Sequence, residues 1–264
     1  MSDPPRPTPG ENRPLAGVRV LLTRPPIAPD PLEARLEELG ANVVCHPVTR
    51  ILPPPDTHRI REIAARLGEF STLAFMSRHA VAAAHEFFLQ QAESVPAIAA
   101  IGTGTRDVLL GYGHEVRWVP EKSNSQSMAE MLIEQVRSSG LAGPVLVLRA
   151  DRGSDVLPKA LTQAGVVFEE LAVYQSKDID RANPVTSREL YEGKFDWVTV
   201  TSSSIAKNVA RLFGDHLENT KVVSISPTTS SAATEVGLKV AAEATKYNVQ
   251  GLVDAILNYR EQNR

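Results

Sequence analysis

The sequence predicts an α/β protein made of two similar domains, each with a doubly wound, flavodoxin-like parallel sheet covered by helices on both faces. Two observations predict this fold class. Short apolar runs alternate with helical patterns from one end of the 264-residue chain to the other, which is typical of β-α-β units. Similar segments also recur at a nearly constant offset, which indicates a duplicated unit. With 42% hydrophobic residues, the chain suffices for one large domain or two of ordinary size.

The first half begins with a strand over 18–24 and a helix over 30–40. Asp30 is a suitable N-cap for that helix, Pro31 occupies its first turn and Gly40 ends it. The β-branched segment 42–52 is expected to be extended. Further helices are predicted over 56–68, 79–89, from about 104, and over 126–138, with strands over 71–77, 96–102 and 115–119.

The second half repeats this rhythm. Strands are predicted over 144–150, 166–176, 197–202, 221–226 and 239–244, and helices over 155–164, 184–192, 204–213, 228–236 and 249–259. Two extended segments, 42–53 and 166–179, are longer than the usual strand of about 5–6 residues. Each can therefore leave one sheet and enter the other domain, although a simple tandem cut near 138–144 is equally compatible with the sequence.

The two halves share landmarks at a constant spacing. Arg24 and Arg149 end similar apolar runs, an offset of 149 − 24 = 125. The same or nearly the same offset relates Gly40 to Gly165, Ser77 to Ser202, Thr105 to Thr229 and Gly113 to Gly237. A period of this length indicates domain-sized copies rather than a solenoid. Two such domains imply a cleft, and ligands of open α/β sheets bind at the carboxyl ends of the strands.

The composition of the chain argues against nucleic-acid binding and against a membrane-spanning segment. The net charge of −3 gives no basic excess for nucleic-acid binding, and no apolar run approaches the roughly 20 residues that span a bilayer. The polar, Pro-rich residues 1–16 are expected to be a disordered tail rather than a signal peptide. Cys45 is the only cysteine, so no disulfide forms within the chain. We expect a soluble, cytoplasmic protein without membrane or nucleic-acid partners.

The segment VVSISPTTSSAATEVG, 222–237, contains unusually many hydroxyls between a strand and a helix. A helix N-terminus carries unpaired N–H groups and a partial positive charge, so it binds anions. The alternative is ordinary N-capping by Ser or Thr. Residues at this and the matching strand ends are candidate ligand-binding residues: Thr23, Ser77, Gly102, Thr103, Gly104, Thr105, Ser202, Ser203, Pro227, Thr228 and Thr229.

Other motifs are weaker. The GTGT segment at 102–105 is only half of a dinucleotide fingerprint, and the six histidines have no metal-ligand spacing, so no cofactor and no metal are expected. The serines at the strand ends lack a nucleophile elbow. Arg24 and Arg149 are cations at matched strand ends, where they either bind an anionic ligand or form salt bridges.

Tyr174 ends the apolar run ELAVYQS and has Thr49 as its counterpart in the first copy, so its phenol is not part of the shared scaffold. A phenol beside a cleft can give a proton or a hydrogen bond to a leaving group. The alternative is a packing tyrosine at a hinge.

An ordered set of segments resembles the uroporphyrinogen-III synthase family over residues 17–259. The set comprises VLLTRP (20–25), AFMSRHAV (74–81), AAIGTGTRDVLLGYG (99–113), VLVLRADRG (145–153), LAVYQ (171–175), VTSSS (200–204), VSISPTTSSAATEVG (223–237) and TKYNVQGLVDAI (245–256). The chain departs from the family pattern at His79, Ala80, Ala150 and Ser226.

The resemblance implies a discontinuous first domain, 17–48 with 177–264, and a second domain over 51–173. A two-stranded β ladder with linker strands at 49–50 and 174–176 would join them. It further implies a monomeric, cofactor-free enzyme of tetrapyrrole and heme biosynthesis, a lyase. A transient contact with the preceding pathway enzyme is left open.

The substrate that the resemblance implies is hydroxymethylbilane, a linear tetrapyrrole with eight carboxylates, and the product is uroporphyrinogen III. Tyr174 matches the family's tyrosine, a candidate proton donor to the departing hydroxyl, and Thr229 would hold a carboxylate. A chain with a net charge of −3 would bind this polyanion through backbone N–H groups and hydroxyls. The alternatives are a non-catalytic two-domain binding protein for a sugar or an anion, and a nucleotide-sugar glycosyltransferase.

Overall fold

The computed structural model describes residues 13–27, 30–139 and 143–263. The chain divides into two compact units, Met1–Thr49 with Asp178–Arg264 (unit 1) and Arg50–Lys177 (unit 2). The chain therefore passes from one unit to the other twice, after Thr49 and after Lys177.

Both units are α/β. The strands are β1 (Arg19–Leu22), β2 (Asn42–Cys45), β3 (Thr49–Leu52), β4 (Thr72–Phe75), β5 (Ala97–Ala100), β6 (Val145–Ala150), β7 (Phe168–Asp178), β8 (Trp197–Val200), β9 (Lys221–Ser224) and β10 (Val240–Glu243). The α-helices are α1 (Pro31–Glu38), α2 (Thr57–Ala65), α3 (Arg78–Phe87), α4 (Thr103–Gly111), α5 (Ser125–Ser139), α6 (Val156–Gln163), α7 (Pro184–Tyr191), α8 (Ser203–Phe213), α9 (Pro227–Glu235) and α10 (Val249–Gln262).

Unit 1 is built on a five-stranded sheet in the order β10-β9-β8-β1-β2, with every neighbouring pair parallel. Counted along this unit, the order is 2-1-3-4-5, the flavodoxin-like arrangement. Leu32 and Leu36 of α1 and Leu252 of α10 fill the core on one face of the sheet. Helices α7, α8 and α9 cover the other face, so the sheet is doubly wound.

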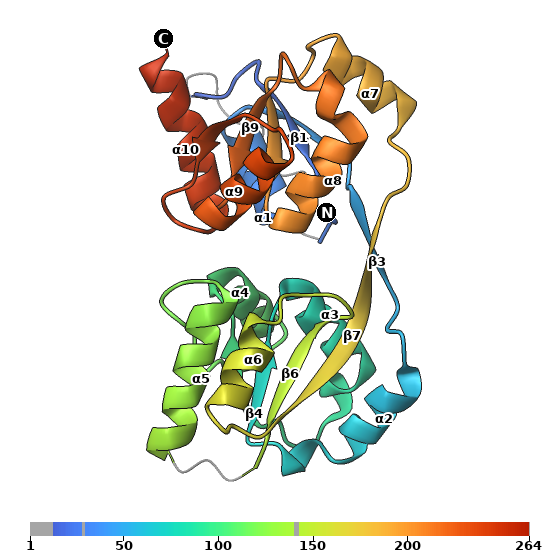
Figure 1. Ribbon diagram of the computed structural model, residues 1–264, viewed down its shortest axis with the longest axis vertical. Helices are drawn as coiled ribbons and strands as arrows, with labels where there is room; N and C mark the ends of the chain where they lie inside the picture. The colour runs from blue at the N-terminus through green and yellow to red at the C-terminus, as the bar shows by residue number, and fades with distance from the viewer. Residues whose placement is uncertain (1–12, 28–29, 140–142, 264) are drawn as a thin grey trace, which may run out of the picture. The chain divides into compact units, whose positions relative to one another are not determined.

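Unit 2 has a sheet in the order β3-β7-β6-β4-β5, in which β7, β6, β4 and β5 pair in parallel. Leu109 of α4 and Val81 of α3 lie in the core on one face, together with residues of α2. Helices α5 and α6 pack side by side over the other face (Figure 1). The order β7-β6-β4-β5 repeats the order β2-β1-β8-β9 of unit 1, with β3 as an added edge strand.

Helix starts confirm the duplication. Helix α3 begins at Arg78 and α8 at Ser203, so the offset is 203 − 78 = 125. Helix α4 begins at Thr103 and α9 at Pro227, an offset of 227 − 103 = 124. Each sheet combines strands of both copies, because β1 and β2 of the first copy lie beside β8 to β10 of the second. The predicted pair of similar, doubly wound parallel-sheet domains is therefore confirmed.

Three expectations need correction. The extended segment 42–52 is divided into β2 and β3 around Pro47, which has no N–H for a ladder bond. Segment 115–119 contributes only an isolated bridge between Trp118 and Ala99, because Arg117 N and Trp118 N both donate to one carbonyl, that of Ile98. The disordered tail cannot extend to residue 16, since Leu15 is fully buried and its N–H donates to Leu39 O. The rest of that expectation, residues 1–12, lies outside the described residues.

Candidate functional site

Two of the predicted ligand residues follow the carboxyl end of β1, and both side chains already have partners within unit 1. The Thr23 side chain is fully buried, and its hydroxyl donates to the carbonyl of Thr199 on the neighbouring strand β8. Arg24 forms a buried ion pair with Asp30, which also caps α1 by accepting from Leu32 N at 2.8 Å. Thr23 thus links two strands. Of the two roles considered for Arg24, ligand binding or a salt bridge, the structure shows the salt bridge.

The Arg24–Asp30 pair controls the ionisation of the carboxyl group. Burial alone raises the pKa of Asp30, but the hydrogen bond and charge of Arg24 and the N–H groups at the start of α1 outweigh it, and the pKa is lowered from 3.8. Asp30 is therefore ionised at neutral pH, and the charge of Arg24 is compensated inside unit 1.

Two turns at the ends of β8 and β9 lie next to each other in unit 1. Ser202 caps α8 by accepting from Ile205 N at 3.2 Å. Ser203 Oγ donates to Thr228 O at 3.5 Å, which connects the two turns. Both turns belong to the hydroxyl-rich set that the sequence predicts as a ligand-binding region.

Ser226, a position where the chain departs from the family pattern, is the N-cap of α9. Its Oγ accepts from Thr229 N at 3.3 Å and lies 3.1 Å from Thr229 Oγ1. Pro227 is the first helical residue, Pro227 and Thr228 are exposed, and Thr229 is buried. Ser226 was recognisable from its place one residue before Pro at a helix start. Part of the hydroxyl content of this turn is thus explained by capping.

Tyr174, where the pairing of β7 with β6 ends, meets Ser77, which follows the carboxyl end of β4 in unit 2. The Tyr174 hydroxyl lies 3.0 Å from Ser77 Oγ, which at the same time caps α3 by accepting from Ala80 N at 3.0 Å. The Tyr174 side chain is 8% exposed, and the His79 ring packs at a centroid distance of 5.8 Å. Tyr174 is therefore both a packing residue and a phenol hydrogen-bonded to the start of a helix.

The ionisation of Tyr174 is suppressed. Burial raises the pKa of the phenol above its usual value of 10.0, and the hydrogen bond from Ser77 only partly opposes this effect. The negative charge of Asp151 raises the pKa further, whereas Arg149 lowers it. The phenol stays protonated at neutral pH and can act as a hydrogen-bond or proton donor.

The GTGT turn differs from the other turns because a glycine precedes its helix. Gly102 is the N-cap residue of α4 and forms no side-chain cap, unlike Ser77, Ser202 and Ser226 at α3, α8 and α9. Thr103 and Gly104 are exposed, and Thr105 is buried. Thr105 N donates to the Gly102 carbonyl at 3.1 Å, so the N–H groups that an external acceptor can reach are those of Thr103 and Gly104.

Arg149, at the end of β6, is also paired. Its guanidinium lies 2.6 Å from Glu170 Oε1 and 3.1 Å from Ser154 O. A Cβ on Gly153 would lie 2.1 Å from the Arg149 guanidinium, so a larger residue there would displace the guanidinium from this position. As with Arg24, the structure shows the salt-bridge alternative.

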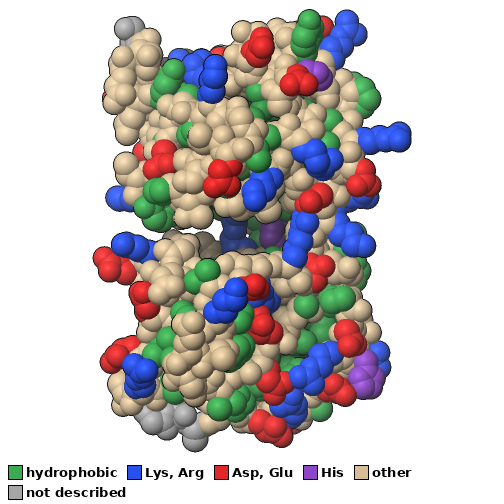
Figure 2. All heavy atoms as spheres, in the orientation of Figure 1, with side chains coloured by type: hydrophobic (Ala, Val, Ile, Leu, Met, Phe, Trp, Pro, Cys, Tyr) green, Lys and Arg blue, Asp and Glu red, His purple; other side chains and the backbone are tan. Residues whose placement is uncertain are grey.

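The structure thus brings the predicted residues together in two sets, Ser202 with Ser203 and Thr228 in unit 1, and Ser77 with Tyr174 in unit 2. A cleft between two domains stays a prediction. Among the described residues, no group of three or more His, Cys, Asp or Glu is placed to hold a metal ion, and no helix is long and apolar enough to cross a membrane. On the face drawn in Figure 2, the described Lys and Arg side chains are mixed with Asp and Glu.

The class defined by this fold and these turns is a duplicated, flavodoxin-like α/β protein with helix N-termini and a buried phenol at the strand ends. The family model described as uroporphyrinogen-III synthase HemD matches residues 30–254. The chain therefore belongs to the uroporphyrinogen-III synthase family, whose members are lyases, and this membership favours the synthase over the non-catalytic binding protein.

Relatives and solved structures agree with this assignment. The chain is 27% identical to uroporphyrinogen-III synthase of Synechococcus elongatus over 95% of its own length and 98% of the relative. It is 26% identical to the synthase of Escherichia coli over 85% of its length and 95% of the relative. It shares its fold with uroporphyrinogen-III synthetase from Helicobacter pylori, with a TM-score of 0.59, 19% identity and coverage of 91% and 99% of the two chains.

Proposed function

We propose that this protein converts hydroxymethylbilane to uroporphyrinogen III, with loss of water and inversion of the last pyrrole ring. The family match over most of the chain and relatives that carry the name of this synthase support the proposal. In line with the family resemblance, we propose a cytoplasmic monomer that acts without a cofactor, with a transient contact to the enzyme that supplies the substrate as a further possibility to test.

The single observation that carries the chemical proposal is the Tyr174 phenol, which is buried, protonated and 3.0 Å from Ser77 Oγ. The reaction begins with cleavage of the terminal C–O bond of the substrate. The departing hydroxyl needs a proton to leave as water, and a positioned phenol can supply it. Ser77 can return a hydrogen bond to the phenolate that forms, because its own Oγ–H is free to rotate.

Loss of water leaves an azafulvenium cation at the end of the tetrapyrrole. We propose that the substituted carbon of the last ring attacks this cation to give a spiro intermediate. Fragmentation, recombination at the other carbon and loss of a proton then yield the macrocycle with the last ring inverted. The release of this proton balances the proton given to the departing hydroxyl. Folding of the substrate so that the substituted carbon is nearest supplies much of the rate as an orientation effect.

Helix N-termini are proposed to hold the carboxylates of the substrate. The uncapped first turn of α4 at Gly102, Thr103 and Gly104 offers N–H groups to an anion. The exposed Thr228 in the first turn of α9, next to the buried Thr229, is a second candidate. Because Arg24 and Arg149 are already paired with carboxylates, the anionic substrate is held mainly by main-chain dipoles.

The test is turnover of hydroxymethylbilane followed by isomer analysis of the oxidised porphyrins. The wild type should give the asymmetric isomer above the symmetric isomer that forms spontaneously. Tyr174→Phe should lower turnover by roughly 10²–10⁴-fold with little change in substrate affinity, because only the proton donor is removed. Tyr191→Phe is the matched control, since Tyr191 is 71% exposed on α7.

Two results would contradict the proposal. Formation of only the symmetric isomer by the wild type would show that the protein is not a synthase. Full turnover by Tyr174→Phe, with the asymmetric isomer still formed, would leave the synthase intact and remove Tyr174 as the proton donor.

A further inference from the structure

Strand β7 contains a bulge immediately before Tyr174. Arg149 of β6 lies opposite Ala172, but the next residue, Ala150, lies opposite Tyr174, so Val173 has no partner on β6. An extra residue of this kind turns the side chains after it to the other face of the sheet.

The bulge decides which face Tyr174 occupies. Leu171, Val173 and Tyr174 all lie in the core that includes Val81 of α3. In a regular strand, consecutive side chains point to opposite faces, so Tyr174 would follow Ala172 to the face covered by α5 and α6. The bulge instead places the phenol beside Ser77 at the start of α3.

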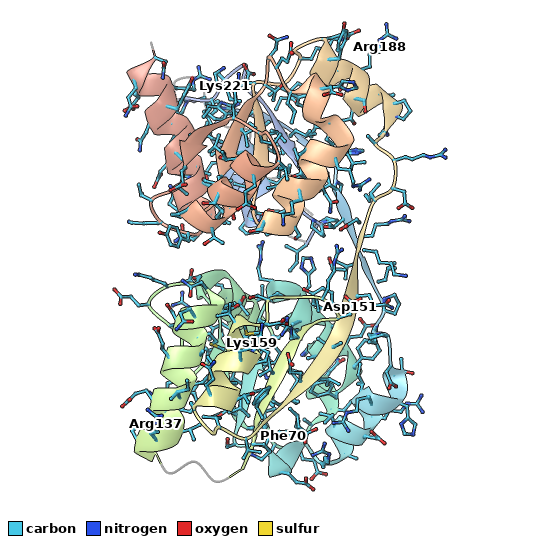
Figure 3. All side chains as sticks on the ribbon, viewed as in Figure 1. Phe70, Arg137, Asp151, Lys159, Arg188 and Lys221 are labelled. Atoms are coloured by element: carbon cyan, nitrogen blue, oxygen red, sulfur yellow. The ribbon has the colours of Figure 1, made fainter. Side chains whose placement is uncertain are left out.

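Asp151 holds β7 directly after the bulge. Its backbone N–H donates to Tyr174 O at 3.0 Å, and its Oδ1 accepts from Ser176 N at 2.9 Å. The side chain thus takes the place of a backbone carbonyl in the ladder and fixes the strand on both sides of Gln175. In Figure 3, Asp151 is labelled next to β7.

We infer that Asp151 is a positioning residue for the synthase reaction, because its carboxylate locks the shifted register that points the Tyr174 phenol toward Ser77. This inference rests on the proposed function. Without the carboxylate, Ser176 N loses its acceptor and the strand can return to regular pairing, which carries the phenol away from Ser77. Asp151 itself need not touch the substrate for this role.

The charge of Asp151 also raises the pKa of Tyr174, so two effects of the carboxylate must be separated. The Asp151→Asn variant keeps an Oδ1 acceptor for Ser176 N but removes the charge. The Asp151→Ala variant removes both. Comparison of these two variants therefore isolates the hydrogen bond. Asp155→Ala is the matched control, because the Asp155 side chain is exposed, pairs with Lys159 and forms no cap bond to α6.

The experiment measures kcat and KM for hydroxymethylbilane on each full-length variant, after thermal unfolding has verified that it is folded. Asp151→Ala should lower kcat roughly 10- to 100-fold, since small displacements of a reacting group have effects of this size. KM should stay within about twofold, because the carboxylate-binding turns are untouched. Asp151→Asn and Asp155→Ala should keep kcat within about threefold of the wild type.

A double variant tests the route of the effect. If Asp151 acts through Tyr174, the Tyr174→Phe/Asp151→Ala protein should be no slower than Tyr174→Phe alone. Multiplied losses in the double variant would overturn the inference, as would wild-type kcat in Asp151→Ala or equal losses in Asp151→Ala and Asp151→Asn.

Failure of the proposed function is distinguishable from failure of this inference. If Tyr174→Phe keeps full turnover, ultraviolet titration of the phenol decides the role of Asp151, with Tyr174→Phe spectra subtracted. The pKa of Tyr174 should fall further toward its ordinary value in Asp151→Ala than in Asp151→Asn, because only the alanine variant releases the buried phenol. Identical titration curves for the two variants would overturn the positioning role.

Discussion

The buried Arg24–Asp30 pair allows a test of whether Arg24 belongs to the scaffold or to the ligand site. Both side chains are nearly inaccessible, at 7% and 6% exposure. In Asp30→Asn the amide oxygen can still accept from Leu32 N and Glu33 N, so the cap of α1 is retained. The charge is lost, and with it the Oδ2 acceptor of Arg24 Nε, because an amide nitrogen takes its place. The guanidinium of Arg24 is then buried without a counter-ion, which should cost about 3–5 kcal/mol.

The double variant Arg24→Met/Asp30→Asn removes both charges while keeping the volume and the cap. Replacement of a buried pair by apolar groups is often nearly neutral, so most of the loss should be recovered, to within roughly 1–2 kcal/mol of the parent. The pairing energy is the difference between the single and double variants in a thermodynamic cycle.

The assay uses Trp197, which is buried in the core of unit 1. The chain has two tryptophans, so a Trp118→Phe background makes Trp197 fluorescence report on unit 1 alone during urea unfolding and during thermal unfolding. A thermal midpoint lower by roughly 10–15 °C is expected for Asp30→Asn, at about 3 °C per kcal/mol. A double variant as unstable as Asp30→Asn would refute the reasoning that an unpaired buried charge causes the loss.

The same pair predicts acid sensitivity with a defined sign. The folded pKa of Asp30 is below its ordinary value of 3.8, so its stabilisation is fully present above the unfolded-state pKa and is lost as pH falls through the folded value. The double variant should therefore lose less stability than the parent below about pH 4. Full turnover by the stable double variant would also show that Arg24 is not needed to bind substrate.

Two further predictions concern the turn at Gly102 and the pH response of unit 1. In Gly102→Ala the new Cβ would lie 2.2 Å from Ser123 Oγ and 2.7 Å from Ser123 Cβ, so the thermal midpoint should fall by the equivalent of about 1–3 kcal/mol and recover when Ser123→Gly is added; no fall would show that the turn has free space. Burial lowers the pKa of His46 below 6.5, so the folded protein resists a proton that the unfolded chain accepts, and stability should decline as pH falls from 6.5 toward the folded value. His46→Gln should flatten the urea midpoints over that range, and parallel curves for the two proteins would contradict this assignment.

The fold could be predicted from sequence because each unit is specified locally and twice. Asp30 before Pro31 marks the start of α1, and the structure shows that cap. Ser77 and Ser202 occupy matching places in the two copies, and each caps the following helix. Alternation of apolar runs and helical patterns thus indicates parallel sheets without knowledge of any long-range contact.

The candidate site was less predictable, because its geometry depends on pairings distant in the chain. The period-2 pattern of β7 places Val173 and Tyr174 on opposite faces, whereas the bulge places both on one face. The bonds next to the bulge come from Asp151, which lies outside β7, and no local residue type in β7 indicates the bulge. The pairing of Arg149 with Glu170, 21 positions away, likewise follows from the alignment of β6 with β7.

Gly102 and Ser226 show how one position in the duplicated scaffold can serve two purposes. They occupy equivalent places at the starts of α4 and α9, and each supplies an acceptor three residues on: Ser226 Oγ accepts from Thr229 N at 3.3 Å, and the Gly102 carbonyl accepts from Thr105 N at 3.1 Å. The N–H groups left to a carboxylate are therefore those of the two residues between, which are the exposed Thr103 and Gly104 at α4 but only Thr228 at α9, because Pro227 has no N–H. An anion therefore meets one more N–H group at α4, so this turn is the stronger candidate for the first contact with a polyanionic substrate.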